Sequence, residues 1–245
     1  MPAVEHVEEV IVYNVAPYRE IDCIVRFFSK QRGRSSGFAF GGLRSKRRFL
    51  GCLEKLNYIT LTLQDYRGYT CLKEARLNKR FSNIHKDPQK LGIAFNCFKF
   101  IESVHKGPVD THKVFSLLLE LLNTLEDASE VPFYFPLFFK ARLCAEYGYK
   151  PTFDVCFDCM KDLKGSGGIF FLEERKLRCK RCSGKRQGGF FLSSYMLEKL
   201  QLIFSASPNN WFAIKIKNFE KNRILPFLDR FVDRTLGFFY RKKPI

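Results

Sequence analysis

The sequence predicts an α+β protein: a five-stranded barrel at the N-terminus, followed by an α-helical domain with an inserted four-cysteine segment. Three observations predict this. The first 80 residues contain short β-branched or aromatic segments separated by turn residues, helical periodicity begins near residue 87, and two Cys-x-x-Cys pairs stand nineteen residues apart. We therefore expect one domain over residues 1–80 and a second over 81–245, with the cysteine segment at 154–186.

The strand-like segments of the first domain are 9–15, 21–29, 33–42, 52–64 and 68–77. Within 57–63, Tyr58 and Thr60 alternate with Ile59 and Leu61, which predicts a strand with one buried face. Residues 65–68 then form a plausible hairpin turn. Five strands in so few residues indicate a small closed barrel, of which the OB-fold is the commonest form that binds nucleic acid.

Helices are predicted in the second domain. Asp87 is a good N-cap and Pro88 suits the first helical position, so one helix should start there and continue to Gly107. Apolar residues at helical spacing predict further helices at about 110–126, 133–147, 192–206 and 220–239.

The chain is strongly basic. Its 245 residues include 42 Lys and Arg against 25 Asp and Glu, a formal charge of +17, which favours polyanionic partners such as nucleic acid. The N-terminus has no secretory signal pattern, and the longest apolar runs fall short of the roughly 20 residues that cross a bilayer. We expect a cytoplasmic protein that does not enter the membrane and whose nine cysteines are reduced.

Four of these cysteines, Cys156, Cys159, Cys179 and Cys182, have the spacing of a zinc ribbon, in which about 15–20 residues separate two Cys-x-x-Cys turns. Thiolates bind Zn²⁺ as a tetrahedron, and each turn supplies two of them. The predicted cofactor is one structural Zn²⁺, because four protein ligands leave no position for a reactive water. The alternative is that these residues are buried or redox-active thiols.

An enzyme is a weaker interpretation. His6 and Glu8 together with Cys156 and Cys159 resemble parts of the zinc deaminase signature, but about 150 residues separate them and the second cysteine pair competes for the metal. We find no catalytic triad or carboxylate pair, so no catalytic residue is assigned.

Residues 23–53 contain no acidic residue and eight basic ones. Phe27, Phe38, Phe40 and Phe49 lie among these charges, as expected for a groove in which phosphates meet cations and bases stack on rings. The alternative is that the rings form the barrel core under a solvated rim. The predicted DNA-binding residues here are Arg32, Arg34, Arg44, Lys46, Arg47 and Arg48, with Phe38 and Phe40 as candidates for base stacking.

A second basic cluster lies in the later half of the cysteine segment. It comprises Lys176, Arg178, Lys180, Arg181, Lys185 and Arg186, of which we predict that Lys180, Arg181, Lys185 and Arg186 contact DNA. The alternative is that the cluster only offsets the net negative charge of a four-thiolate zinc site.

The chain resembles the RecO family of bacterial recombination mediators. The resemblance covers most of the chain. It rests on Arg19-Glu20 before Asp22, on Gly33, on Gly41 with the loop Arg44–Arg48, on Leu53, and on Leu143, Gly148 and Pro151 ahead of the cysteines. It departs at Met160, where members often have Gly, and at 172–177, where they often have a Gly-Gly turn. Beyond residue 190 only helical character matches.

The resemblance implies an OB-fold followed by a helical domain with a four-cysteine zinc ribbon, and a non-enzymatic role in DNA repair. It implies binding of single- and double-stranded DNA, annealing of complementary strands, and action with RecR to load RecA onto DNA coated by single-strand-binding protein. The implied partners include the C-terminal tail of that coating protein, and the implied location is nucleoid-associated.

The residues themselves leave a second function open. An OB-fold and a basic zinc ribbon serve an RNA-binding protein of the ribosome or of tRNA equally well, because base contacts cannot be told from sequence.

Overall fold

The computed structural model describes residues 5–66, 68–104 and 110–240. They divide into two compact units, one formed by the chain up to Leu91 with Asp110–Ala128, and the other by the remaining residues. The division of the chain at residue 80 remains a prediction; the first unit includes a helix from beyond that point. Among the described helices, none combines the length and the apolar character that a membrane crossing requires.

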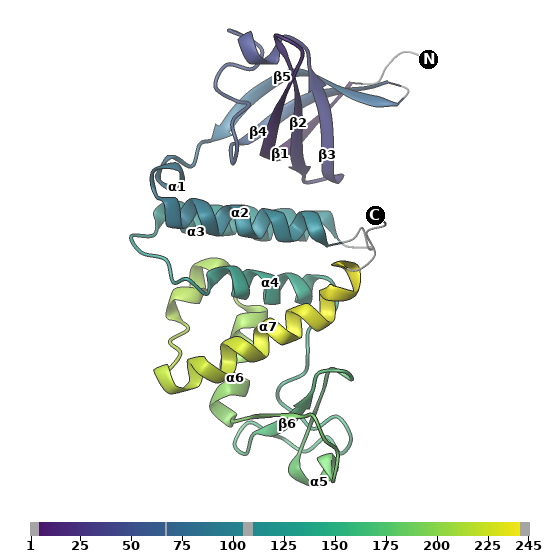
Figure 1. The fold of residues 1–245 in the computed structure, drawn as a ribbon, viewed down its shortest axis with the longest axis vertical. Helices are drawn as coiled ribbons and strands as arrows, with labels where there is room; N and C mark the ends of the chain where they lie inside the picture. The colour runs from purple at the N-terminus through teal and green to yellow at the C-terminus, as the bar shows by residue number, and fades with distance from the viewer. Residues whose placement is uncertain (1–4, 67, 105–109, 241–245) are drawn as a thin grey trace. The chain divides into compact units, whose positions relative to one another are not determined.

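The first unit contains a closed five-stranded barrel (Figure 1). Its strands are β1 (Glu5–Tyr18), β2 (Asp22–Ser29), β3 (Gly33–Ala39), β4 (Tyr58–Tyr66) and β5 (Tyr69–Lys79), arranged in the order β1-β2-β3-β5-β4. The long strand β1 pairs with β4 through its first half and with β2 through its second, with a register shift between Val12 and Asn14. β3 and β5 form a parallel pair at Phe38 and Cys71. The predicted fold is confirmed.

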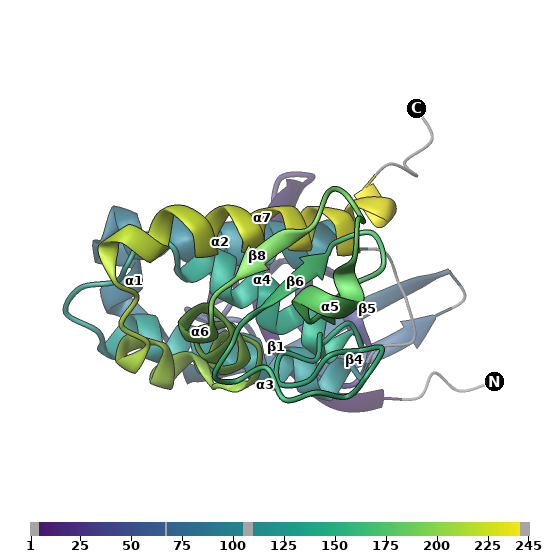
Figure 2. The same ribbon diagram turned by 90° about the horizontal axis from the view of Figure 1, so that it is seen from below.

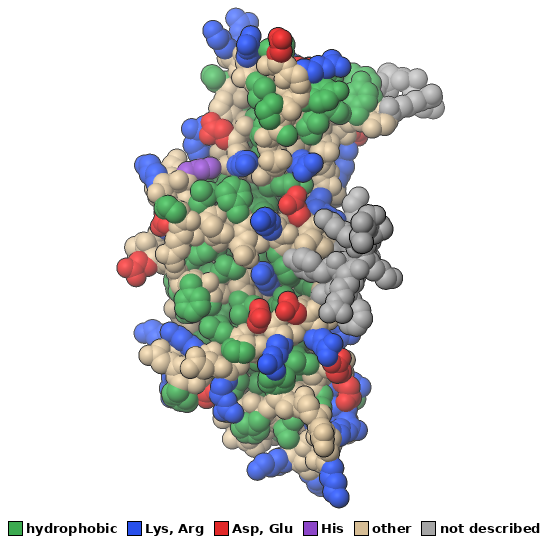
Figure 3. All heavy atoms as spheres, in the orientation of Figure 1, with side chains coloured by type: hydrophobic (Ala, Val, Ile, Leu, Met, Phe, Trp, Pro, Cys, Tyr) green, Lys and Arg blue, Asp and Glu red, His purple; other side chains and the backbone are tan. Residues whose placement is uncertain are grey.

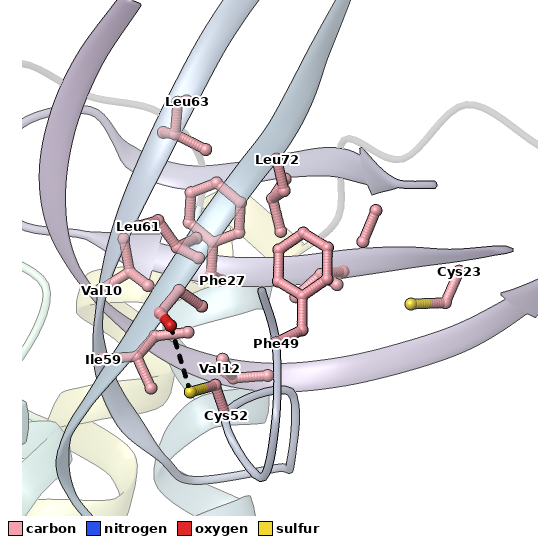
Figure 4. Close-up of a cluster of buried hydrophobic side chains, with 13 residues drawn as sticks. Val10, Val12, Cys23, Phe27, Phe49, Cys52, Ile59, Leu61, Leu63 and Leu72 are labelled. Atoms are coloured by element: carbon pink, nitrogen blue, oxygen red, sulfur yellow. Dashed lines mark hydrogen bonds between the residues drawn. The ribbon is translucent and has the colours of Figure 1, made fainter. Parts of the chain in front are cut away.

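Inward-pointing apolar side chains, which alternate with outward-pointing ones along the strands, fill the barrel. Ile59, Leu61 and Leu63 of β4 point inward with no exposed surface, while the residues between them are half-buried. Figure 4 shows them around Phe27 and Phe49, which come from β2 and from the segment that precedes β4. The ring of a buried Phe removes a large apolar area from water, so these two side chains contribute strongly to the stability of the barrel.

β4 begins six residues later than the sequence predicts. Residues 52–57 form turns instead, because Leu56 adopts a left-handed backbone conformation with φ 69°. The Asn57 side chain is fully buried and donates to the carbonyl oxygens of Gly51 and Cys52 at 3.0 and 3.1 Å, which closes this loop. Similarly, β3 ends at Ala39 because the chain turns at Gly41, φ 68°, into the short 3-10 helix η1 (Gly42–Arg44).

The β4–β5 hairpin is tighter than expected. Asp65 and Tyr66 lie in the strand rather than in the turn, with Asp65 opposite Thr70 and Tyr66 opposite Tyr69. Arg67, which belongs to the predicted turn, lies outside the described residues.

Three helices follow the barrel: α1 (Ser82–Lys86), α2 (Pro88–Ser103) and α3 (Thr111–Asp127). The Asp87 carboxylate accepts the backbone N–H groups of Gln89 and Lys90, which confirms the predicted N-cap. The predicted end of α2 at Gly107 lies outside the described residues. The five-residue α1 was not predicted.

The second unit is built on aromatic packing. Its main helices are α4 (Phe135–Glu146), α6 (Ser194–Ser205) and α7 (Asn218–Tyr240), with the 3-10 helix η2 (Pro208–Ala213). Trp211 of η2 meets Phe135 and Phe138 of α4 edge to face, with ring centroids 5.6 and 6.0 Å apart. Many of the 27 phenylalanines of the sequence are therefore core residues of this unit.

A three-stranded sheet of β6 (Gly168–Phe171), β7 (Lys176–Arg178) and β8 (Phe190–Leu192) lies against these helices (Figure 2). Phe170 of β6 is fully buried and meets Phe227 and Phe231 of α7, with centroids 5.2 and 6.1 Å apart. The sheet carries the cysteine segment, whose last turn is α5 (Lys180–Ser183).

Candidate metal centre and nucleic-acid interface

The first Cys-x-x-Cys pair forms a tight turn. The N–H of Cys156 donates to the carbonyl of Lys161 at 2.8 Å, and the N–H of Met160 donates back to Cys156 at 2.9 Å. Met160 has φ 58°, a conformation that glycine adopts without strain and other residues adopt at a cost. The structure thus places Met160, at which the sequence departs from the family resemblance, in a conformation that favours glycine.

The second pair lies at the start of α5. Cys179 is the N-cap, its sulfur accepts the N–H of Cys182 at 3.4 Å, and the N–H of Cys179 donates to the sulfur of Cys156 at 3.3 Å. The N–H of Phe157 donates to the carbonyl of Leu177 in β7 at 2.8 Å, which joins the two turns. Local hydrogen bonds thus bring both pairs to one point.

The four sulfurs fit one tetrahedral metal ion. All of them lie within 4.8 Å of one another, and the sulfurs of Cys159 and Cys179 are 3.8 Å apart. A tetrahedron with metal–sulfur bonds of about 2.3 Å has sulfur–sulfur edges of about 3.8 Å. The predicted ligands are therefore brought together in a group that can hold a metal ion.

The acidity of these thiols also suits a cation. Burial raises the pKa of Cys156, but the N–H groups of Cys179, Cys159 and Asp158 that face its sulfur outweigh burial and lower this pKa to about 6. In contrast, hydrogen bonds to the sulfurs of Cys159 and Cys179 raise the pKa of Cys182 to about 12. Four sulfurs this close ionise together only when positive charge lies between them, which a bound dication supplies.

The remaining five cysteines are Cys23, Cys52, Cys71, Cys97 and Cys144, and all are buried. Burial raises the pKa of Cys97 and of Cys144 far above that of a free thiol. They are core residues.

The basic cluster of the cysteine segment divides into two kinds of side chain. Arg178 is 3% exposed, and its guanidinium pairs with the carboxylates of Asp158 and Glu174, both at 2.7 Å. Lys176 covers the ring of Phe157, with Nζ 3.6 Å from the centroid. These two residues support the ribbon. The four predicted DNA contacts, Lys180, Arg181, Lys185 and Arg186, are all exposed.

In the barrel, the loop from Arg44 to Arg48, here the basic loop, presents four exposed cations. Arg48 Nη2 donates to the carbonyl of Phe40 at 2.7 Å, and the Phe49 N–H donates to the Ser45 hydroxyl at 3.2 Å, so the loop has a defined shape. Among the described residues, the side chains of Arg44, Lys46 and Arg47 have no ion-pair partner. Figure 3 shows lysine and arginine side chains beside hydrophobic ones on the face of the barrel in that view.

The four phenylalanines that the sequence places among these charges have different environments. Phe27 and Phe49 belong to the barrel core (Figure 4), so for them the core interpretation holds. Phe38 is half-buried outside the core and Phe40 is 41% exposed, with the two rings nearly parallel and their centroids 6.2 Å apart. Only this second pair is accessible to a base.

The other two predicted DNA contacts differ from the basic loop. The Arg32 guanidinium pairs with Glu8, whose side chain is 5% exposed, and with Asp65 at 3.1 Å. Arg34 is half-buried on β3, opposite Phe28 of β2. Arg32 is thus held by carboxylates and positions the segments around it, and its assignment as a phosphate contact remains a prediction.

Three exposed tyrosines, which lie at the end of the barrel that carries Phe38 and Phe40, were not predicted from the sequence. Tyr18 and Tyr69 contact the ring of Phe38 edge to face, with centroids 5.3 and 5.9 Å apart, and Tyr66 stacks on Tyr69 at 5.1 Å. These residues are distant in sequence, and the pairing of β3 with β5 brings them together. No spacing along the chain could have indicated this.

Comparison with known proteins covers both parts of the chain. Family models described as "Recombination protein O N terminal" and "Recombination protein O C terminal" match residues 1–81 and 85–244. A DNA repair protein RecO from Maridesulfovibrio salexigens is 37% identical over 236 residues, 95% of each chain. Proteins of the same name from Solidesulfovibrio magneticus and Nitratidesulfovibrio vulgaris are 35% identical, over 86% and 94% of each chain. The chain therefore belongs to the recombination protein O (RecO) family of DNA repair proteins.

Proposed function

We propose that this protein is a non-enzymatic mediator of DNA repair and recombination that binds single- and double-stranded DNA and anneals complementary strands. The observation that carries the proposal is the basic loop, whose four cations are exposed and whose Arg48 guanidinium donates a hydrogen bond to the backbone carbonyl of Phe40, an exposed aromatic residue. Phosphates of either DNA form can bind the cations, and neutralising them lowers the repulsion between two strands.

Annealing by such a surface needs no catalytic residue. Two complementary strands repel each other until their charge is screened, and cations held at fixed positions on the protein provide that screening. The bases remain unpaired on the surface and are free to find their complements. Family membership supports the further steps, in which the protein acts in the cytoplasm with RecR and helps to load RecA onto DNA coated by single-strand-binding protein.

In the same proposal the cysteine segment holds one structural zinc ion, with Cys156, Cys159, Cys179 and Cys182 as ligands. When bound, zinc supplies a cross-link between the two turns. Arg178 neutralises the carboxylates of Asp158 and Glu174 by ion pairs. The exposed side chains of Lys180, Arg181 and Lys185 are available to bind a phosphate.

Competition binding tests the proposal against an RNA-binding role. At a fixed salt concentration, labelled single-stranded DNA is displaced by unlabelled DNA or RNA of the same sequence. We expect DNA to compete at least as well as RNA, and the protein to accelerate annealing of complementary DNA strands. A strong preference for RNA, without annealing activity, would contradict the proposal.

The partner is tested separately by titration with a peptide of the C-terminal tail of single-strand-binding protein. A mediator of this family binds that peptide, whereas an RNA-binding ribbon protein has no reason to. Saturable binding is expected, and no binding at any concentration would remove this partner from the proposal.

A further inference from the structure

Five aromatic side chains form one connected surface at the end of the barrel that carries the basic loop. Tyr18 comes from the end of β1, Phe38 and Phe40 from the end of β3, and Tyr66 and Tyr69 from the β4–β5 hairpin. We call them the five-ring cluster. Each ring contacts the next, with centroid distances between 5.1 and 6.2 Å, from Phe40 through Phe38 to Tyr18 on one side and to Tyr69 and Tyr66 on the other.

The cluster is exposed to solvent. Tyr18, Phe40, Tyr66 and Tyr69 are 39–43% exposed, and only Phe38, at the centre, is half-buried. Large side chains outside a core are normal when they are scattered, but a contiguous exposed group is typical of a binding site. The stability of the barrel does not require these rings, because its core is filled by other residues.

Cations surround the rings. The Arg19 guanidinium lies 5.3 Å from the centroid of Tyr18, and the Lys73 ammonium lies 5.9 Å from that of Tyr66. The Arg48 guanidinium donates a hydrogen bond to the backbone carbonyl of Phe40. A ligand that contacts these rings therefore meets positive charge at three points on their edge.

The acidic residues of this end are mostly engaged by the protein itself. Asp22 accepts the N–H of Gly41 at 2.7 Å, and Asp65 accepts the Thr70 hydroxyl at 2.6 Å and pairs with Arg32. Glu20 is the exposed carboxylate that remains in the β1–β2 turn. The charge of the surface is thus complementary to an anionic ligand with flat apolar faces.

We propose that the five-ring cluster binds the unpaired bases of single-stranded DNA and makes this surface select single strands over duplex. The proposal rests on the DNA-binding function proposed above and assigns Tyr18, Tyr66 and Tyr69 to it. Unpaired bases present both faces to a ring, whereas bases inside a duplex are stacked on each other and offer none. The rings therefore add affinity for single strands only, and the basic loop adds affinity for both forms.

The test uses the full chain with Tyr66 and Tyr69 both changed to Ala. Both residues lie on an exposed hairpin, so the fold should persist, and Tyr66→Phe with Tyr69→Phe keeps the rings while removing the hydroxyls. Phe133→Ala is the matched control, since Phe133 is an exposed ring of the other unit, 73% accessible. Fluorescence anisotropy measures the Kd for labelled oligothymidylate and for its duplex with oligoadenylate, over a series of salt concentrations.

We expect the double Ala variant to lose about 5- to 150-fold in affinity for oligothymidylate for each base that stacks on Tyr66 and Tyr69, since one stacked base contributes about 1–3 kcal/mol. Its affinity for the duplex and its salt dependence should match the wild type, as should all values for the Phe and Phe133→Ala variants. The wild-type protein should bind an abasic oligonucleotide at least as weakly as the double Ala variant binds oligothymidylate, because an abasic strand offers no base to any of the five rings.

Equal losses on single strand and duplex, or no loss on either, would overturn the proposal; the second result would also be expected if the rings served an apolar protein partner. Failure of the wild-type protein to bind DNA in either form would instead refute the proposed function, and with it this inference. The two failures are therefore distinguishable by the wild-type data alone.

Discussion

The guanidinium of Arg32 is paired with the carboxylate of Asp65, with Nη1 and Oδ2 3.1 Å apart. Arg32 lies in the turn between β2 and β3, and Asp65 lies near the tip of the β4–β5 hairpin. The same guanidinium also pairs with the buried carboxylate of Glu8 in β1. One side chain therefore links the first half of β1, the β2–β3 turn and the β4–β5 hairpin, from which Tyr66 and Tyr69 extend.

This pair predicts a change in acidity. The hydroxyl of Thr70 and then the charge of Arg32 lower the pKa of Asp65 below its ordinary 3.8. In Arg32→Gln we expect this pKa to rise, because the charge of Arg32 and its hydrogen bond to the carboxylate are lost. A titration of the Asp65 side-chain carboxyl by NMR measures it, and Thr70→Val should raise the pKa as well, because the Thr70 hydroxyl also lowers it.

The sign of the stability effect follows from the lowered pKa. A carboxylate whose pKa is depressed by folding stabilises the fold above its unfolded pKa, and this contribution disappears as the pH falls through the folded value. Acid unfolding should therefore begin at a higher pH in Arg32→Gln than in the wild type. An unchanged Asp65 pKa in that variant would show that the ion pair does not form in solution.

Zinc content provides the second prediction. The protein should contain one equivalent of zinc, and Cys156→Ser or Cys179→Ser should release it and open the 156–184 segment to protease. Structural zinc binds with apparent energies of about 10–16 kcal/mol in finger peptides, so the ribbon without it should be unstable. The barrel should resist cleavage in every variant.

Cys97→Ala is the matched control for these variants, because Cys97 is buried away from the cluster and should leave the zinc content at one. Zinc that survives both ligand substitutions would contradict the assignment of the site.

A third prediction concerns Met160, whose positive φ is required by the first cysteine turn. Met160→Gly should leave zinc affinity the same or higher, since glycine adopts this conformation without strain. Met160→Val should lower it, because a β-branched side chain makes the left-handed conformation costlier. Competition with a chromogenic chelator measures both, and the opposite order of affinities would contradict the geometry of the turn.

A fourth prediction concerns the attachment of the ribbon to the helices. Phe170 is fully buried against Phe227 and Phe231, so Phe170→Ala should cost about 3–5 kcal/mol of unfolding free energy. Urea denaturation measures this change, and Phe133→Ala at an exposed position should cost far less. Equal effects of the two substitutions would mean that the ribbon does not depend on this packing.

The sequence predicts the barrel, the five long helices and the four sulfur ligands because each has a local signal. Strands such as β4 alternate with period two, Asp87 marks a helix start, and the cysteine spacing is specific. The short helix α1 has too few residues to display a period, and the turns at 52–57 depend on the left-handed Leu56, which no local rule assigns to leucine.

The functional surface was less predictable for a physical reason. A run of basic residues does not indicate which of them the protein itself engages. Arg32 is among the predicted DNA contacts, yet its guanidinium pairs with Glu8 and Asp65. The tyrosines of the five-ring cluster meet only after the barrel closes, through the contact of β3 with β5. Pairing across a closed sheet is tertiary information, and no window of the sequence contains it.

The most direct test of the account reverses the charge of the basic loop. In the variant with Arg44, Lys46, Arg47 and Arg48 changed to Glu, we expect strand annealing to be abolished while the fold is retained. The dependence of log affinity on log salt for single strands should become shallower by about 0.7 for each phosphate that the variant no longer binds. A control variant carries the same change in net charge at scattered exposed positions: Lys86, Lys99, Lys215 and Lys217 changed to Glu.

The decisive comparison is the annealing rate of the two variants at one salt concentration. We expect normal annealing by the control and none by the basic-loop variant. Equal annealing rates, with the salt dependence unchanged in the basic-loop variant, would contradict the claim that this loop holds DNA.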